Sequence, residues 1–184
     1  MRLLLVFAAL PFLMAAEDAG MPKPKFTSDG KLVRPEGYRE WMFVGSSLGM
    51  GYTEGQVPTK PTYHNIFIQR EAFQEYKRSG KFPENTMLVM DVLNPGKDVS
   101  INKQGSFSDG FVGFEVALKS KKVDGGWAYY NFIGPTPGKP LAESKAFEKD
   151  RCWNCHNQHG AYDNVFLQFY PVLRDARPVA KSGH

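Results

Sequence analysis

The pattern of apolar and polar residues predicts more strands than helices. Four runs are rich in β-branched and aromatic residues and are bounded by turn residues, which is typical of strands. These runs lie at residues 63–68, 86–93, 111–119 and 127–133. The last two flank a Lys-rich turn that passes through Asp124-Gly125-Gly126, so we expect them to form a β-hairpin.

Two segments of good helix formers predict helices. Residues 70–79 are followed by Gly80, which favours the end of a helix at that point. Residues 142–151 form the second predicted helix, and this helix would lead directly into the two cysteines of the chain.

Three further segments have weaker patterns. Residues 41–44 are a short apolar run. The Gly-rich residues 45–51 lack the spacing and the basic residue of a phosphate loop, so we interpret them as a flexible connection. Residues 165–173 are aromatic-rich and predict either a strand or a helix interrupted at Pro171.

The N-terminal residues 1–16 have the plan of a signal peptide. A short basic start precedes an apolar run that ends in small residues, and cleavage is expected near Ala15 or Ala16. In a Gram-negative bacterium such a signal would send the chain to the periplasm. The run is shorter than the roughly 20 residues that span a bilayer, so no membrane span is expected after cleavage. An uncleaved anchor is the alternative.

The remainder of the chain divides into an extended, Pro-rich arm at residues 17–35 and one domain at residues 36–178. The order of elements predicts the α+β class, with a mainly antiparallel β-sheet and a few helices in a single domain. The formal net charge of the 184-residue chain is +4, without a basic block. This weak excess gives no reason to expect a nucleic-acid partner.

The most informative motif is Cys152-Trp153-Asn154-Cys155-His156, which holds the only two cysteines of the chain. In an exported protein, C-x-x-C-H is the attachment signal for a haem c. Both thiols would form thioether bonds to one haem per chain, and His156 would ligate the iron. A redox disulfide or a zinc site that includes His159 are the alternatives, but the thioredoxin-like context and the usual ligand spacing are missing.

Several blocks of the chain occur in the order found in one known family. They are Tyr38-Arg39-Glu40-Trp41, Tyr63-His64-Asn65, Gly80-Lys81-Phe82-Pro83, Met87 to Val92, Gly113-Phe114-Glu115-Val116, Gly126 to Tyr130, Cys152 to Asn164, and Phe169 to Leu173. With these blocks the chain resembles the cytochrome P-460 and cytochrome c′-beta family. The resemblance implies a mostly antiparallel β fold, a homodimer, and a haem with His156 on one side of the iron and an open distal side.

The resemblance also draws attention to the predicted strand at residues 86–93. Relatives that oxidise hydroxylamine carry a lysine there that is cross-linked to the haem, whereas this chain has Met90 at the matching position and no lysine in the strand. Met90 would share a face with Leu88, while Asp91 points to the other face. Met90 serves either as an apolar wall of the distal pocket or as a sixth ligand of the iron.

Other candidates for the haem pocket come from neighbouring strands. His64 is a second candidate for the distal side, and Glu115 is either exposed to solvent or a pocket carboxylate able to relay protons. Phe114, together with Phe111 and Tyr130, is a candidate to cap the distal side. Arg39 is expected to bind a haem propionate or to form a surface salt bridge with a glutamate. His159 is expected either to support the groups around the iron ligand or to have a structural role.

Three classes of function follow from these residues. The protein binds a gaseous or nitrogen-oxide ligand such as NO or CO in an apolar distal pocket. Alternatively, it is an oxidoreductase for hydroxylamine, NO or peroxide that passes electrons to another cytochrome. In the third class it is an electron carrier with Met90 or His64 as the sixth ligand. The missing lysine favours the first class over the second.

Overall fold

The computed structural model describes residues 20–52, 54 and 58–178. The predicted signal peptide at residues 1–16 and the first residues of the predicted arm lie outside this part of the chain. Among the described residues, no helix combines the length and the apolar character that a membrane crossing needs.

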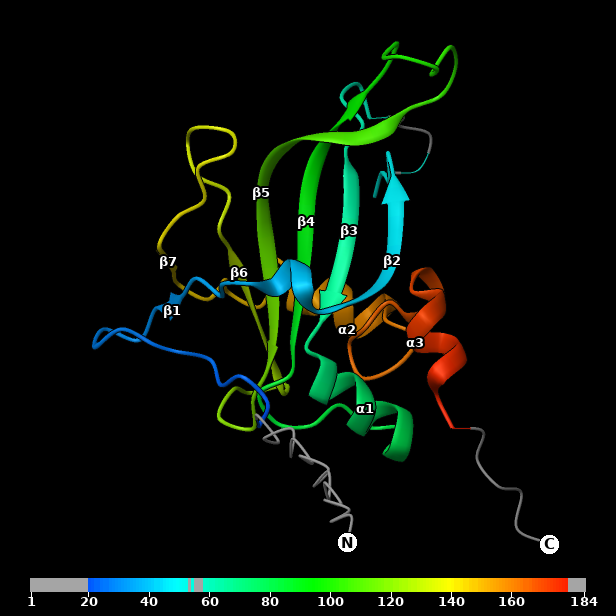
Figure 1. The fold of residues 1–184 in the computed structure, drawn as a ribbon. Coiled ribbons are helices and arrows are strands. Elements are labelled where there is room, and N and C mark those ends of the chain that lie inside the picture. The colour runs from blue at the N-terminus through cyan, green and yellow to red at the C-terminus, as the bar shows by residue number, and fades with distance from the viewer. Residues whose placement is uncertain (1–19, 53, 55–57, 179–184) are drawn as a thin grey trace, which may run out of the picture.

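A five-stranded antiparallel sheet forms the centre of the fold (Figure 1). Its strands, in spatial order, are β2 (Met42–Leu48), β3 (Tyr63–Ile68), β4 (Met87–Gly96), β5 (Phe107–Lys119) and β6 (Trp127–Asn131). Each strand pairs with the next one in the chain, so the sheet is a meander. The prediction of the α+β class with a mainly antiparallel sheet is confirmed.

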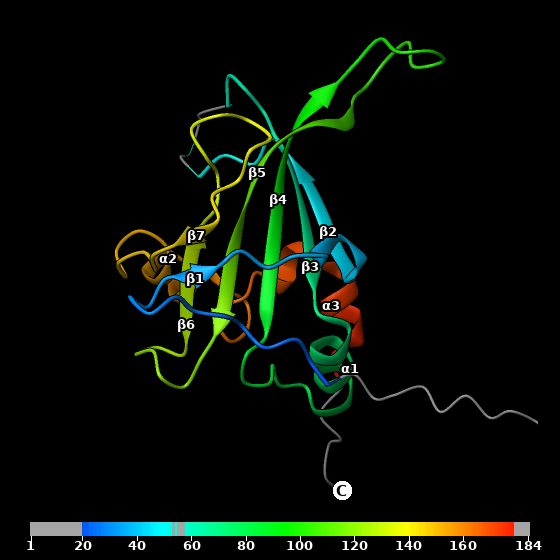
Figure 2. The same ribbon diagram turned by 60° about the vertical axis from the view of Figure 1, so that its left-hand side comes forward.

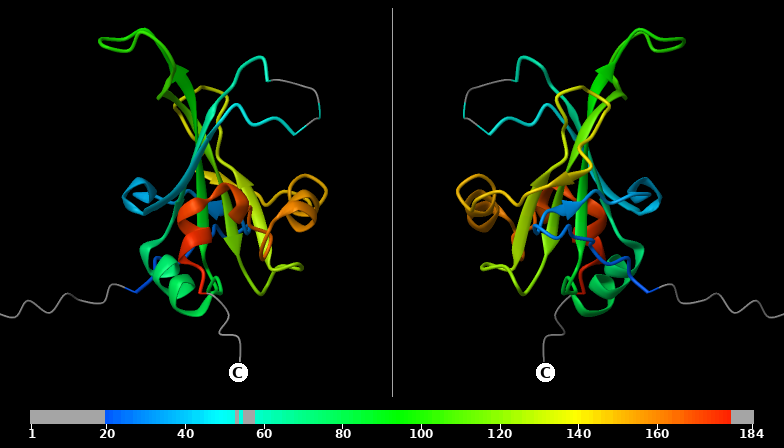
Figure 3. Two further views of the ribbon diagram at one scale, coloured as in Figure 1. Left: turned by 90° about the vertical axis from the view of Figure 1, so that its right-hand side faces the viewer. Right: turned by 90° about the vertical axis from the view of Figure 1, so that its left-hand side faces the viewer.

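The two faces of the sheet are covered differently. The N-terminal arm crosses one face with β1 (Leu32–Val33) and the short 3-10 helix η1 (Tyr38–Glu40) (Figure 2). The helices lie on the other face: α1 (Arg70–Ser79), α2 (Trp153–His159), the 3-10 helix η2 (Leu167–Phe169) and α3 (Pro171–Ala176). Figure 3 shows the sheet from the side, with η1 and α2 on opposite sides of it.

Each face has its own hydrophobic core. Under the arm the core contains Leu32, Tyr38, Met87, Val89, Phe114, Val116, Leu118, Ala128, Tyr130 and Phe132. Under the helices it contains Val44, Ile66, Ile68, Ala72, Phe73, Tyr76, Phe82, Leu88, Trp127, Tyr129, Val165, Leu167 and Leu173. Neighbouring residues of a strand alternate between the two cores, as Leu88 and Val89 do, because strand side chains point to opposite faces.

The strand β3 and the helix α1 have the bounds that the sequence predicted. The helix ends at Gly80, whose φ of 73° is readily adopted by glycine. The strands β4 and β5 are longer than predicted, because their pairing continues through Pro95 to Gly96, which lies opposite Phe107. The expected end of the strand before Pro95 is therefore wrong, and the two strands form a hairpin that projects beyond the sheet (Figure 2).

The predicted helix at residues 142–151 does not form. Instead, β7 (Glu143–Ser144) pairs with β1, and the Phe147 amide donates to the Tyr129 carbonyl at 2.8 Å. Pairing with these elements satisfies the backbone and outweighs the modest helix propensity of the segment. The helix α2 begins later, at Trp153, and contains Cys155 and His156 itself.

Two other predictions for loops need correction. The segment 45–51 is not only a connection, because Gly45 to Leu48 belong to β2. Glycine is needed at position 45, since a Cβ there would lie 2.9 Å from the Phe169 carbonyl oxygen. The segment 165–173 contains the helix α3, but this helix starts at Pro171, where proline fits the first turn, rather than being interrupted there.

Candidate functional site

A cavity of about 940 Å³, counted with its part open to solvent, lies between the helix-covered face of the sheet and α2. Most of its lining is apolar or aromatic: Met50, Tyr52, Ile66, Leu88, Met90, Val116, Ala117, Tyr129, Tyr130, Phe147, Val165, Phe166, Phe169 and Tyr170. The polar lining residues are Ser46, Ser47, His64, Glu115, Cys152, His156 and Asn164.

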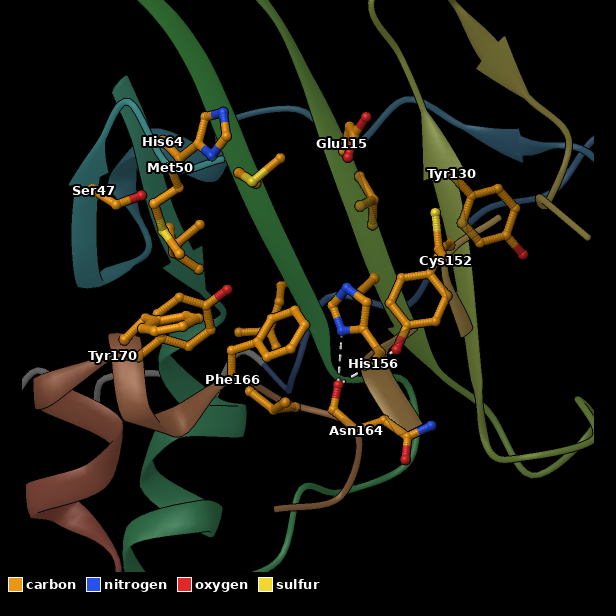
Figure 4. Close-up of a pocket in the computed structure, with 18 of the residues that line it drawn as sticks. Ser47, Met50, His64, Glu115, Tyr130, Cys152, His156, Asn164, Phe166 and Tyr170 are labelled. Atoms are coloured by element: carbon orange, nitrogen blue, oxygen red, sulfur yellow. Dashed lines mark hydrogen bonds between the residues drawn. The ribbon is translucent and has the colours of Figure 1, made fainter. Parts of the chain in front are cut away.

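His156 lies in this cavity in a defined orientation (Figure 4). Its Nδ1 lies 2.9 Å from the backbone oxygen of Asn164. A carbonyl oxygen can only accept, so Nδ1 carries the proton and Nε2 is the nitrogen left to ligate a metal. Burial lowers the pKa of His156, against the opposing effect of the Asn164 hydrogen bond. The neutral form that a metal requires is thereby favoured.

Two aromatic rings hold the plane of this imidazole. The ring centroids of Tyr129 and Phe166 lie 4.4 Å and 4.3 Å from that of His156. The Tyr129 hydroxyl also donates to the Asn164 carbonyl, at 3.4 Å. The Asn164 oxygen therefore accepts from two side chains of the cavity, and Figure 4 shows both bonds meeting at this atom.

The Asn164 carbonyl is presented by an unusual turn. Asp163 and Asn164 have φ angles of 47° and 59°, so two consecutive residues are in the left-handed region. Asn and Asp adopt this region more readily than other residues with a side chain. The side-chain nitrogen of Asn164 is buried and has no hydrogen-bond partner among the described residues.

The two cysteines occupy different environments. Cys152 lines the cavity and is half-buried, whereas Cys155 is exposed, and both thiols are free. Burial raises the pKa of Cys152 to about 11. The intervening Trp153 donates from Nε1 to the Gly125 carbonyl at 3.2 Å, which attaches the start of α2 to the turn between β5 and β6.

The sheet supplies the other side of the cavity. Leu88 and Met90 come from β4, His64 from β3 and Glu115 from β5. Figure 4 shows His64 and Glu115 at the end of the cavity away from Asn164. Burial raises the pKa of Glu115, with Arg151 opposing the rise, and burial lowers the pKa of His64. Both effects favour the uncharged forms of these side chains.

Four of the predicted distal residues thus share one cavity with Cys152 and His156: His64, Leu88, Met90 and Glu115. Tyr130 lines it as well. His159 is exposed at the end of α2, and its backbone carbonyl accepts from Gln168 Nε2 at 2.8 Å. The role of its side chain stays a prediction.

Three predicted residues lie elsewhere. Phe114 packs in the core under the arm, because it precedes Glu115 in the strand and points to the opposite face. Arg39 also lies on that face, where its Nε donates to Asp91 Oδ2 at 2.8 Å and its guanidinium lies 4.4 Å from the Phe111 ring centroid. Neither Phe114, Phe111 nor Arg39 lines the cavity, so the expected capping and propionate roles are corrected.

The sequence did not single out the residues that orient His156. Tyr129 and Phe166 resemble ordinary core aromatics, and the contribution of Asn164 comes from its backbone, which carries no side-chain signal. The Asp163-Asn164 dipeptide is a turn signal, but its contact with a histidine eight positions earlier depends on the fold.

The residues present fit a covalently attached haem. The cavity is large and apolar, one thiol faces it and the other lies one helical turn away. The neutral imidazole has one nitrogen bound and the other left for the iron.

Comparison with known families agrees with this fit. The family model described as Cytochrome P460 matches residues 35–167. A search of curated proteins returned no match.

Proposed function

Because the chain belongs to the cytochrome P460 family, which makes it a haem protein, we propose that it is a periplasmic c-type protein that binds a small gaseous ligand, NO or CO. Cys152 and Cys155 would attach one haem per chain through thioether bonds, and His156 would ligate the iron. Export to the periplasm rests on the signal-peptide pattern of residues 1–16.

The observation that carries the proposal is the orientation of His156. A hydrogen bond from Nδ1 fixes its tautomer, and the two flanking rings fix its plane. Ligating histidines in proteins almost always have such a partner on the second nitrogen. A haem held by Cys152, Cys155 and His156 would supply an iron able to bind a small diatomic molecule.

The composition of the cavity supports an apolar ligand. Leu88, Met90 and Ile66 cover the strands that line it and offer no hydrogen-bond donor. The neighbouring Glu115 is favoured in its uncharged form by burial. This apolar part of the lining favours NO and CO, which need no strong hydrogen bond, over polar ligands that need one.

The absence of a lysine supports ligand binding over hydroxylamine oxidation. Among the described residues that line the cavity none is a lysine, and Met90 lies on the wall contributed by β4. A thioether cannot form the nitrogen cross-link that the resemblance implies for hydroxylamine-oxidising relatives.

An optical spectrum of the purified holoprotein, oxidised and reduced, tests the open axial position. We expect a mainly five-coordinate, high-spin reduced haem whose bands shift when NO or CO is added. A low-spin, six-coordinate spectrum without added ligand would contradict the proposal and favour an electron carrier with Met90 or His64 as the sixth ligand.

Haem staining after denaturing electrophoresis tests covalent attachment. Cys152→Ala combined with Cys155→Ala should abolish the stained band, because no other cysteine exists in the chain. Each single variant should keep a weaker band through the remaining thioether bond. Staining of the double variant as strong as that of the wild type would refute attachment through these thiols.

A second candidate function is an oxidoreductase for hydroxylamine, NO or peroxide that passes electrons to another cytochrome. The observation that favours it is Glu115, a carboxyl group in the cavity whose pKa is raised by burial, as is typical of side chains that transfer protons. A red-shifted Soret band, which marks a cross-linked haem, together with turnover that is lost in Glu115→Gln would favour this function.

We further propose that the protein forms a homodimer, as the family resemblance implies. Sedimentation velocity of the holoprotein should give twice the mass of one chain, and a single-chain mass would contradict the proposal.

A further inference from the structure

The orientation of His156 depends on where one backbone atom lies. The Asn164 carbonyl oxygen accepts from Nδ1, and it belongs to a turn with two consecutive left-handed residues. Such conformations cost free energy and persist only when the surroundings hold them. The contacts that hold this turn therefore also determine the orientation of the His156 imidazole.

Asp163 is the residue through which the turn is held. Its carboxylate accepts from Lys119 Nζ at 2.9 and 2.7 Å and from Trp127 Nε1 at 3.2 Å. Lys119 Nζ also lies 5.1 Å from the Trp127 ring centroid, within the range of a cation–π contact. The side chains of Lys119 and Asp163 are only 21% and 29% exposed, so solvent screens this ion pair less than a surface pair.

The two donors come from one rigid place in the sheet. Lys119 is the last residue of β5, Trp127 is the first of β6, and they are register partners at the closed end of the hairpin. Trp127 is 2% exposed, so its indole is fixed by the core. The hairpin thus anchors Asp163, and the next residue presents its carbonyl to His156.

We propose that Lys119, Asp163 and Trp127 are positioning residues for the iron ligand, an inference that rests on the proposed role of His156. By holding the turn, they keep the Asn164 carbonyl at hydrogen-bond distance from Nδ1. A strong hydrogen bond at Nδ1 makes the imidazole a more basic ligand, which stabilises the oxidised iron. Lys119, Asp163 and Trp127 therefore keep the reduction potential of the haem iron low.

The reduction potential of Asp163→Asn holoprotein is the decisive measurement. Asparagine keeps the shape of the side chain and tolerates the left-handed backbone, so the substitution removes the charge that pairs with Lys119. We expect an upward shift of the potential. We also expect a lower iron–histidine stretching frequency in the resonance Raman spectrum of the reduced protein.

Lys119→Met breaks the same ion pair from the other side and should shift both quantities in the same direction. Because the two substitutions remove one interaction, the double variant should differ little from the more strongly shifted single variant. Trp127→Phe keeps a ring in the core and removes only the indole donor, so a smaller upward shift is expected. This variant decides the question if the charge variants do not fold.

Lys31→Met is the matched control. Lys31 is also partly buried, with a side chain that is 28% exposed. It pairs with Asp29 in the arm and with Glu143 in β7, away from the cavity. It should lower the free energy of unfolding without moving the potential or the Raman band. A shift as large as that of Asp163→Asn would show that loss of any ion pair has this effect and would overturn the inference.

Unchanged potential and Raman frequency in Asp163→Asn and Lys119→Met, with haem attached as in the wild type, would also overturn the inference. The pyridine haemochrome assay establishes attachment independently. Failure of the wild type itself to hold haem through Cys152 and Cys155 would instead contradict the proposed function.

Discussion

Two acidic residues on neighbouring strands of the sheet are treated in opposite ways. Asp91 on β4 faces the core under the arm and is 2% exposed. It accepts from the Tyr38 hydroxyl and from Arg39 Nε. Glu115 on β5 faces the cavity, and no described side chain donates a hydrogen bond to it. Both side-chain oxygens of Asp91 thus accept hydrogen bonds. Glu115 has no such donor, and burial raises its pKa.

The comparison distinguishes an acidic residue that stabilises the fold from one that is available for chemistry. The buried Asp91 fixes the position of the arm on the sheet, because its two partners, Tyr38 and Arg39, both belong to η1. A carboxyl group without a partner costs free energy, and such costs concentrate at functional sites. The two faces of one sheet are thus specialised, one for stability and one for the site.

The largest expected effect comes from Asp91→Ala, which tests the structural face. The substitution leaves the buried Tyr38 hydroxyl and the half-exposed Arg39 without their acceptor. We expect the free energy of unfolding to fall by about 2–3 kcal/mol, as for other buried groups that lose a charged partner. Urea unfolding measures the loss, and the haem spectrum should not change. A cost below about 0.5 kcal/mol, typical of surface substitutions, would contradict this interpretation.

Tyr38→Phe should have a smaller effect on the same network. The ring stays packed at 4.9 Å from Phe114, so only the hydroxyl donation to Asp91 is removed. Since Arg39 remains as a partner of the carboxylate, we expect a loss of about 1.5 kcal/mol, again from urea unfolding. A loss as large as that of Asp91→Ala would show that Arg39 contributes nothing to the pairing.

Glu115→Gln tests the cavity face through pH. The pKa of Glu115 in the folded protein is raised above its ordinary value of 4.5, so the folded state keeps its proton when the unfolded state has lost it. The wild type should therefore lose stability relative to the variant as pH rises above 4.5, up to the raised pKa. Below that window the two should differ by a constant amount. Parallel unfolding free energies across the whole range would show that Glu115 is not desolvated.

Met90→Leu should have the smallest effect. Leucine keeps an apolar side chain of similar volume on the cavity wall, so the spin state of the haem is expected to remain nearly unchanged. The optical spectrum of the reduced holoprotein measures this. Loss of a low-spin signal on substitution would identify Met90 as an iron ligand and would remove the apolar character assigned to this side of the cavity.

The sequence predicted those parts of the fold that local patterns determine. The strand at residues 63–68 and the helix at 70–79 have the predicted bounds, because alternation and a terminal glycine mark them locally. The predicted helix at residues 142–151 was wrong, because this segment pairs with β1 and β6 instead. The pairing with β1 joins Leu32 to Ser144, more than a hundred positions away, and local propensity contains no information about such a partner.

The candidate site divides in the same way. The C-x-x-C-H motif and the cavity positions of Met90, Leu88, Glu115 and His64 followed from spacing, alternation and family resemblance. The orientation of His156 did not, since it depends on a backbone carbonyl and on rings from β6 and the C-terminal segment. Arg39 was placed wrongly because the sequence did not reveal that Asp91 would be buried beside it.

The turn between β5 and β6 has a consequence for how this chain can vary in evolution. A Cβ at Gly125 would lie 2.3 Å from the Nε1 of Trp153, so the indole packs directly against the backbone of Gly125. Any insertion in residues 120–126 would displace Trp153, and with it the helix that carries both thiols. The projecting β4–β5 hairpin meets no such restriction at its tip (Figure 1). Relatives should therefore differ in length at residues 97–104 while keeping the shorter turn at constant length.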